Sequence, residues 1–323
     1  MNAQQETTIA FASRKRRKLL SLALFISFFA GCLGLPQIAP LEAPKPEAGP
    51  DHYYFTINGK RVHYVMVGKG PPVLLLHAGG TSWHDWEGII PVLASNYTVI
   101  APDMPGAGDS EELNGTHNVE SYEAFVVSFL SALHLRETRI RLMGMSFGGM
   151  TALRFSLDHQ DQVDRLVLLE VAQSYTHPER RTALNLLANL AQNDFMRENA
   201  KWWVYRLGQT SLFLPFDLDV GPGFLKSSSR ATLEILLSWS QMKTPDDEIR
   251  RLDIPVLLLA AENDREVYAS ATQELASLLP NSKIIIVPGF RHYDFGKKNL
   301  GAGGVVDQAI VSFLSNTPIS TEP

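Results

Sequence analysis

The sequence of 323 residues contains one cysteine, Cys32, and therefore forms no intrachain disulfide. No group of cysteine and histidine residues has the spacing of metal ligands. Basic residues form no block outside the N-terminus, and the formal net charge is −5. Because nucleic acid is bound by a clustered basic face, a nucleic-acid partner is not expected. Internal repeats are also absent from the sequence.

The composition is that of an ordinary globular protein. Apolar residues make up 45% of the chain and charged residues 20%, which is close to the average for soluble domains. The length suits one large domain or two modest ones, and it is sufficient to bury a sizeable core.

The first fifty residues differ from the rest of the chain. A basic cluster, "SRKRRK" (13–18), precedes an uncharged apolar segment (19–35), and a stretch rich in Pro and Ala (36–50) follows. A basic segment before an apolar one is the pattern of a secretory signal. We therefore expect residues 1–35 to be a signal, lipoprotein or membrane-anchor segment, and residues 36–50 to be an extended tether.

The apolar segment ends in "FAGC", which resembles a bacterial lipobox with Cys32 as the lipidated residue. This interpretation predicts an exported protein that is anchored in a membrane as a lipoprotein. Two other interpretations of this segment stay open. Residues 19–41 carry no charge, so an uncleaved anchor helix could reach the roughly 20 residues of a membrane span. Ordinary cleavage would instead release a secreted enzyme.

From residue 51 onward, apolar strands alternate with helical patterns. This alternation predicts an α/β fold, in which a mostly parallel sheet is flanked by helices on both faces. The expected strands are 53–59, 61–68, 71–80, 97–103, 139–146, 163–172, 254–264 and 282–289. The expected helices are 122–135, 148–159, 268–280 and 303–316.

One segment interrupts the alternation. Residues 173–245 contain no clear strand but many helix formers and aromatic residues. Because this segment lies between two sheet strands, we expect a helical cap inserted into a core formed by residues 51–172 and 246–316. Residues 317–323 would then be a C-terminal tail.

The motif "GMSFGG" (144–149) stands between an expected strand end and an expected helix start. That is the context of a nucleophile elbow, in which a strained strand-to-helix turn exposes a serine hydroxyl above the sheet edge. Small residues on both sides allow the strand and the helix to pack closely, and the helix N-terminus favours a developing oxyanion. Ser146 is therefore a candidate nucleophile.

A nucleophilic serine needs a base, and the base needs an acid that orients it. His292 follows the expected strand 282–289, and Asp264 follows the expected strand 254–264. Both positions lie at the carboxyl ends of strands, where open α/β sheets bind their ligands. Glu170, at the end of another strand, is the rival acid.

Seven other histidines are not expected to take part in catalysis. His52 and His63 belong to the expected N-terminal hairpin, and His134 and His159 to helix ends, where a cation suits the helix dipole. We expect surface positions for His84, His117 and His177.

Residues 53–316 resemble the α/β-hydrolase fold superfamily. Besides the elbow, "HAGG" (77–80) resembles the oxyanion loop after the third strand, and "DMPGAGDS" (103–110) matches the D-x-x-G-x-G-x-S loop of many members. The positions of Asp264 and His292 match the remaining triad positions of the family.

The resemblance implies a role for each matching residue. Ser146 is expected to be the nucleophile, Asp264 the acid and His292 the base, with the backbone N–H groups of Gly79 and Phe147 as oxyanion donors. The sequence departs from the family pattern at one position, because Ala78 stands where many relatives have glycine after the histidine.

The implied reaction is acyl transfer to water without a metal or an organic cofactor. A carboxylic ester is the first choice of substrate, so the expected partners are a small acyl compound and water. Alternatives on the same triad are a C–C bond hydrolase, an amidase or an acyltransferase, and a non-catalytic binding protein is the alternative of another class. Aromatic residues of the cap either form its own core or line an acyl pocket, for which Trp202, Trp203 and Phe213 are the candidates.

The lipoprotein interpretation makes a distinct prediction for Cys32→Ser. The substitution would block lipidation and leave an unprocessed precursor, because Cys32 is the residue that would be lipidated. In the wild type, the acyl chains on Cys32 would hold the protein in the membrane, at about 0.8 kcal/mol per buried CH₂. Intact-mass measurement of the membrane fraction checks this. A wild-type mass that still includes residues 13–18 would exclude cleavage before Cys32 and favour the anchor helix.

Overall fold

The computed structural model describes residue 49 and residues 51–112, 114–177, 227–292, 294–296, 300–301 and 303–315. They belong to one compact unit, residues 45–323. Cys32 and nearly all of residues 1–50 lie outside the described part of the chain, as do residues 178–226 and 317–323, so the expectations for them stay predictions. None of the described helices combines the length and the apolar character needed to cross a membrane.

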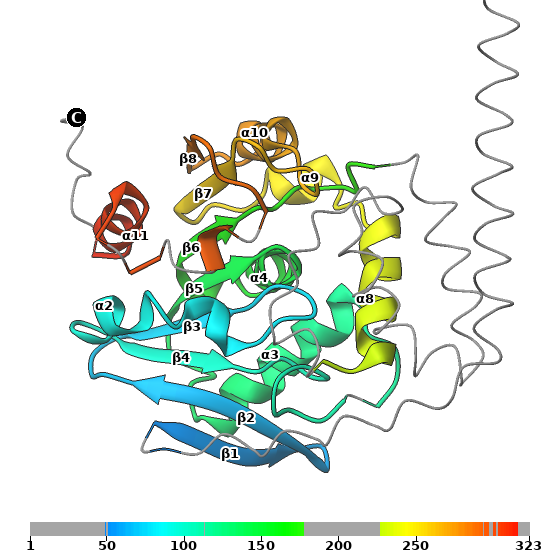
Figure 1. The fold of residues 1–323 in the computed structure, drawn as a ribbon, viewed down its shortest axis with the longest axis vertical. Coiled ribbons are helices and arrows are strands. Elements are labelled where there is room, and N and C mark those ends of the chain that lie inside the picture. Colours follow the sequence, from blue (N-terminus) through cyan, green and yellow to red (C-terminus); the bar gives the residue numbers. More distant parts are fainter. Residues whose placement is uncertain are drawn as a thin grey trace, which may run out of the picture. The chain divides into compact units, whose positions relative to one another are not determined.

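An eight-stranded sheet forms the centre of this unit (Figure 1). Its order is β1-β2-β4-β3-β5-β6-β7-β8, and only the β1–β2 and β2–β4 pairs are antiparallel. The mostly parallel sheet predicted from the sequence is thus confirmed. The strands are β1 (His52–Ile57), β2 (Lys60–Val67), β3 (Pro72–Leu76), β4 (Thr98–Pro102), β5 (Ile140–Met145), β6 (Val163–Leu169), β7 (Val256–Ala261) and β8 (Ser282–Val287).

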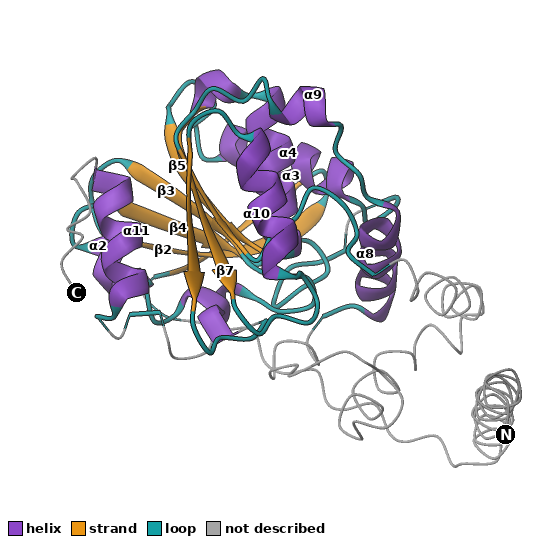
Figure 2. Ribbon diagram, turned by 90° about the horizontal axis from the view of Figure 1, so that it is seen from above, coloured by secondary structure: helices purple, strands orange, loops and turns teal. Residues whose placement is uncertain are grey.

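Helices cover both faces of the sheet. Figure 2 shows α2 and α11 on one side of the strands and α3, α4 and α10 on the other. The described helical elements are η1 (Trp83–Trp86), α2 (Ile90–Ala94), α3 (Val119–Ala132), α4 (Phe147–Asp158), η2 (Gln160–Gln162), α8 (Ser229–Gln241), α9 (Asp246–Ile249), α10 (Ala269–Leu278) and α11 (Val305–Ser315). Of these, α8 lies within the segment expected to be a cap.

The sheet separates two apolar cores because successive side chains of a strand point to opposite faces. In β3, Leu74 belongs to the core that contains Phe129 of α3. Its neighbour Leu75 belongs to the core on the other face, with Trp86 of η1. All four side chains are fully buried, and each stabilises the fold by about 1.5–3 kcal/mol. Burial on both faces explains why the central strands are apolar without a polar alternation.

The start of α3 differs from its expected position. The helix begins at Val119 rather than at residue 122, because Asn118 caps it. The Asn118 side chain accepts a hydrogen bond from the Ser121 N–H, and the Ser121 hydroxyl oxygen accepts one from the Asn118 N–H. This reciprocal pair satisfies N–H groups that a helix start otherwise leaves without partners.

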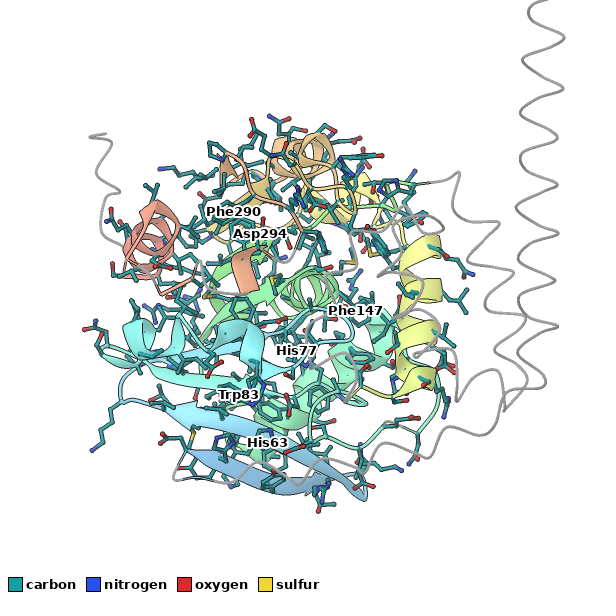
Figure 3. The ribbon with its side chains drawn as sticks, viewed as in Figure 1. His63, His77, Trp83, Phe147, Phe290 and Asp294 are labelled. Carbon is teal, nitrogen blue, oxygen red and sulfur yellow. The ribbon has the colours of Figure 1, made fainter. Side chains whose placement is uncertain are left out.

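The loop after β4 is held by one buried carboxylate, Asp103. It accepts hydrogen bonds from His63 Nδ1 at 2.7 Å, from the Trp83 N–H at 2.9 Å and from the Asp109 N–H at 2.9 Å. Gly108 follows in the same loop with a φ of +51°, and a Cβ there would collide with the Asp103 carboxylate. In the view of Figure 3, His63, Trp83 and His77 follow one another from the β1–β2 hairpin towards the start of α4. The carboxylate therefore joins the hairpin, η1 and this loop.

Asp103→Asn should lower the free energy of unfolding by about 3 kcal/mol, since it leaves buried donors without a charged acceptor. Burial alone would raise the pKa of Asp103, but the hydrogen bond from His63 opposes it, and the pKa lies below its ordinary value. The stabilisation is therefore present above the pKa of the unfolded chain and is lost in acid. Urea unfolding at pH 7 and below pH 4 checks this. The exposed Asp161→Asn is the control, and an equal loss at both pH values would contradict the prediction.

Candidate active site

Ser146 occupies the junction between β5 and α4. β5 ends at Met145 and α4 begins at Phe147. Ser146 has φ 50° and ψ −119°, and its N–H donates to the carbonyl oxygen of Leu169 at 2.9 Å. A non-glycine residue in this region costs about 1–3 kcal/mol, which the surrounding structure must offset. The serine is thus held in a strained turn at the carboxyl end of a strand.

The glycines around Ser146 are required by close packing. A Cβ on Gly148 would collide with the backbone oxygens of Leu76 and His77, which follow one another at the end of β3. A Cβ on Gly144 would lie 2.5 Å from the oxygen of Gly148, far inside van der Waals contact. The first turn of α4 can therefore approach the sheet only because these positions lack side chains.

His292 lies between Ser146 and Asp264. Its Nε2 is 3.0 Å from the Ser146 hydroxyl oxygen, and its Nδ1 is 2.7 Å from an oxygen of Asp264. The other Asp264 oxygen accepts hydrogen bonds from the N–H groups of Glu266 at 2.7 Å and Val267 at 2.9 Å. His292 and Asp264 are 5% and 4% exposed. The three residues predicted from the sequence are thus brought together in a serine–histidine–aspartate chain of hydrogen bonds.

Glu170, the rival acid, also lies in the site. It follows β6 directly, is fully buried, and has a φ of +56°. One of its carboxylate oxygens is 3.5 Å from His292 Nδ1. Burial by itself lowers the pKa of His292, but the charges of Glu170 and Asp264 outweigh it and raise the pKa above its ordinary value. Two carboxylates therefore favour the protonated imidazole.

The same three side chains are a possible metal-binding set. Glu170, Asp264 and His292 each offer one ligand atom, and these atoms lie within 4.8 Å of one another. A metal ion on His292 Nδ1 would have to displace the proton that this nitrogen shares with Asp264. With Ser146 on the other ring nitrogen, the arrangement suits proton transfer instead.

The two residues that carry the expected oxyanion donors lie next to each other. A Cβ on Gly79 would be 3.3 Å from the Cβ of Phe147. Neither of the two N–H groups donates a hydrogen bond to an acceptor within the described part of the chain. Phe147 opens α4, so its N–H has no partner in the helix. The two N–H groups are therefore candidates for binding a charge that would develop beside Ser146.

The loop that carries Gly79 is fixed by Asp85, a residue that the sequence analysis did not single out. Asp85 accepts hydrogen bonds from the Ala78 N–H at 3.1 Å and from the Thr81 hydroxyl at 2.5 Å. Burial raises the pKa of this carboxyl to about 7. The methyl group of Ala78 fits because the left-handed conformation in this loop falls on Gly80, with φ 77°, and not on residue 78.

His77 has a structural role in the same loop. Its Nδ1 lies 2.7 Å from the carbonyl oxygen of Ala78, and its Nε2 accepts a hydrogen bond from the Met104 N–H at 2.8 Å. These contacts assign the neutral tautomer with the proton on Nδ1. Burial, the largest influence, lowers the pKa of His77 below its ordinary value, which agrees with a neutral ring.

Helix α8 lies against the loop that carries Gly79. A Cβ on Gly79 would be 3.1 Å from Cγ2 of Ile235. The small cavity beside this loop is lined by residues 77–80 and 104–107, Tyr122, Ser227, Ala231, Thr232 and Ile235. Trp239 of the same helix is 9% exposed and packs edge-on against Tyr175. The candidate substrate-binding residues of the expected cap, Trp202, Trp203 and Phe213, lie outside the described residues.

Two of the histidines expected on the surface are buried, which corrects that expectation. His117 lies 3.0 Å from the Tyr122 hydroxyl, and its backbone N–H donates to Glu234 of α8 at 2.8 Å. His177 Nε2 lies 3.1 Å from the carbonyl oxygen of Glu266. His117 is covered by contacts with α8, and His177 by contacts with the β7–α10 loop. The sequence around each histidine does not indicate these contacts. His84 is exposed as expected.

A larger cavity, of about 480 Å³, lies between α3, α4 and α8. Its lining includes Asn118, Met150, Leu153, Glu234 and Leu237. None of Ser146, Asp264 and His292 lines it, so it is separate from the hydrogen-bonded chain.

Known proteins share this fold and parts of this sequence. A family model described as alpha/beta hydrolase fold matches residues 71–200. A soluble epoxide hydrolase from Corynebacterium sp. (strain C12) is 39% identical over 120 residues, 37% of this chain and 41% of that protein. A 2-hydroxy-6-oxo-2,4-heptadienoate hydrolase from Pseudomonas putida is 29% identical over 244 residues, 73% of this chain and 87% of that protein. The structure of a thermophilic esterase from Thermogutta terrifontis matches with a TM-score of 0.65 at 20% identity, covering 82% of this chain and 98% of that one.

The sheet order, the turn at Ser146 and these matches define the class of protein. The chain has the α/β-hydrolase fold, and its residues 71–200 match the model of that family. Its two relatives named above are both hydrolases, and the chain matches less than half the length of the epoxide hydrolase.

Gly148→Ala should disrupt the junction between β5 and α4. The added methyl group would collide with two backbone oxygens, and neither can move without shifting β3 or α4. We expect a loss of about 3 kcal/mol in the free energy of unfolding, at the upper end for overpacking, together with loss of any activity that depends on Ser146. Gly304→Ala is the matched control, because a Cβ there meets nothing within 4 Å. Equal stability of the two variants would contradict this account of the glycines.

Proposed function

We propose that the protein is a serine hydrolase that cleaves a carboxylic ester through an acyl-enzyme on Ser146. The observation that carries the proposal is the unbroken chain from the Ser146 hydroxyl through His292 to Asp264. Ser146, at the start of this chain, directly precedes Phe147, and Phe147 lies next to Gly79. A nucleophile, a base, an orienting acid and oxyanion donors are the four parts that acyl transfer requires.

In the first half of the reaction, the Ser146 oxygen attacks the ester carbonyl while its proton passes to His292 Nε2. The carbonyl electrons move onto the oxygen, which the N–H groups of Gly79 and Phe147 bind. Loss of such a donor typically costs about 3 kcal/mol of barrier stabilisation. Collapse of the intermediate expels the alcohol, which takes the proton from His292 and leaves the acyl group on Ser146.

In the second half, a water molecule repeats the sequence. His292 accepts a proton from the water, the hydroxide adds to the acyl carbonyl, and the second intermediate expels the Ser146 oxygen. That oxygen recovers its proton from His292, and the acid product leaves. Asp264 holds the imidazole in the tautomer with Nδ1 protonated and stabilises its charged form.

The apolar surroundings of the oxyanion loop support an acyl substrate. Phe147 and Ile235 border Gly79, and both side chains are buried. A pocket with apolar walls and a few oriented donors is the usual form of a small-molecule site. A serine at the elbow also argues against epoxide hydrolysis, because the epoxide hydrolases of this superfamily use an aspartate there.

C–C bond hydrolysis is the second candidate, and the relative from Pseudomonas putida favours it. The substrate in that protein's name, 2-hydroxy-6-oxo-2,4-heptadienoate, contains neither an ester nor an amide, so its hydrolysis breaks a carbon–carbon bond. The same nucleophile, base and oxyanion donors would serve at its ketone. A non-catalytic binding protein is disfavoured because the triad positions are all occupied by competent residues.

Ser146→Ala should lower kcat by a factor on the order of 10⁴ or more and leave the stability nearly unchanged. A p-nitrophenyl ester series and a 6-oxo-2,4-dienoate are assayed in parallel, with the exposed Ser95→Ala as the control. A fluorophosphonate probe should label Ser146 alone.

Turnover of the dienoate without turnover of any ester would replace the proposal by the second candidate. Failure of the fluorophosphonate to label Ser146, together with full activity of Ser146→Ala, would overturn both.

A further inference from the structure

Two strained residues stand at the ends of neighbouring strands. Among the described residues, four residues other than glycine have a positive φ: Asn58, His134, Ser146 and Glu170. Asn58 lies in the β1–β2 turn and His134 just after the end of α3, where this conformation is common. Ser146 and Glu170 instead follow directly after β5 and β6, which pair in parallel. Backbone strain of this kind is concentrated at functional sites.

Glu170 is held firmly in this position. Its N–H donates to the carbonyl oxygen of Leu259 in β7 at 2.9 Å, and its side chain is fully buried. A buried carboxylate is costly unless it meets positive charge or hydrogen-bond donors. His292 Nδ1 lies 3.5 Å from one of its oxygens.

The same nitrogen is already bonded to Asp264, whose oxygen is 2.7 Å away. His292 therefore has two carboxylates on one nitrogen and the Ser146 hydroxyl on the other. Two more acidic groups influence this ring. Glu266 follows Asp264 in the β7–α10 loop, and Asp85 comes from η1.

We propose that Glu170 is a positioning residue of the reaction, a second carboxylate that stabilises the protonated His292 and can take over from Asp264. The proposal rests on the proposed function. When Ser146 attacks, its proton moves to Nε2, and the imidazole becomes a cation whose Nδ1–H stays bonded to Asp264. Glu170 lies close enough to share the stabilisation of that charge, and no bond to Glu170 forms or breaks.

The first test measures the pKa of His292 directly, by NMR titration of its imidazole nitrogens in the whole protein. An opposite charge within 4–6 Å raises the pKa of a histidine by about 1–3 units. Glu170→Gln should therefore lower the pKa of His292 by about 1 unit or more. Glu170→Asp, which keeps the charge, should give a value between the two. Glu262→Gln, which removes an exposed charge after β7, is the matched control and should leave the pKa unchanged.

An unchanged pKa in Glu170→Gln would overturn the proposal. Should that variant fail to fold, Glu170→Ala, which also removes the charge, decides, since a pKa equal to that of the wild type would then have the same meaning. This measurement needs no substrate, so it tests Glu170 even if Ser146 turns out not to be the nucleophile.

The second test follows the rate of fluorophosphonate labelling of Ser146 against pH. His292 must be neutral to accept the proton, so the rate rises as the pH passes its pKa. In Glu170→Gln the acidic limb should move to lower pH while the plateau rate falls, because a weaker base removes the proton less well. A merely structural loss would lower the whole curve without moving the limb. No labelling of the wild type at any pH would contradict the proposed function instead.

The third test compares Asp264→Asn with the double variant Asp264→Asn/Glu170→Gln. If Glu170 takes over, the double variant should label at least about tenfold more slowly than Asp264→Asn, which corresponds to one pKa unit. Identical rates of the two variants would show that Glu170 does not replace Asp264.

Discussion

The described site depends on the contact between the first turn of α4 and the end of β3. The backbone of Gly148 lies against the carbonyl oxygens of Leu76 and His77, and this contact brings the helix start beside the loop that carries Gly79. Ser146 stands in its strained turn at this junction, and Phe147 lies next to Gly79. The second half of the site is added by β7 and β8, whose ends carry Asp264 and His292 along the same sheet edge.

Local patterns in the sequence were sufficient to predict most of the fold and the central residues. All eight strands and the helices α3, α4, α10 and α11 lie where apolar runs and helical periodicity indicated. Ser146, His292 and Asp264 could be found because each follows a recognisable strand. The short elements η1, α2 and α9 contain too few residues to show a helical periodicity, so the sequence did not predict them.

The rest could not be predicted because it arises from contacts between distant segments. Asp85 lies in a short turn, and only the folded loop shows that it binds the Ala78 N–H. His117 and His177 carry no local sign of burial, since the segments that cover them are far away in the sequence. The sequence presented Asp264 and Glu170 as rivals, whereas the structure places both carboxylates near one nitrogen of His292.

The pairing of β6 with β7 determines how freely the segment between these strands can vary in length and sequence. Residues 173–245 leave the sheet after β6 and return before β7, and these two strands are hydrogen-bonded neighbours. The segment therefore closes a loop whose two ends are already fixed by the sheet. Its length and sequence can vary at a small entropic cost while Ser146, Asp264 and His292 keep their distances.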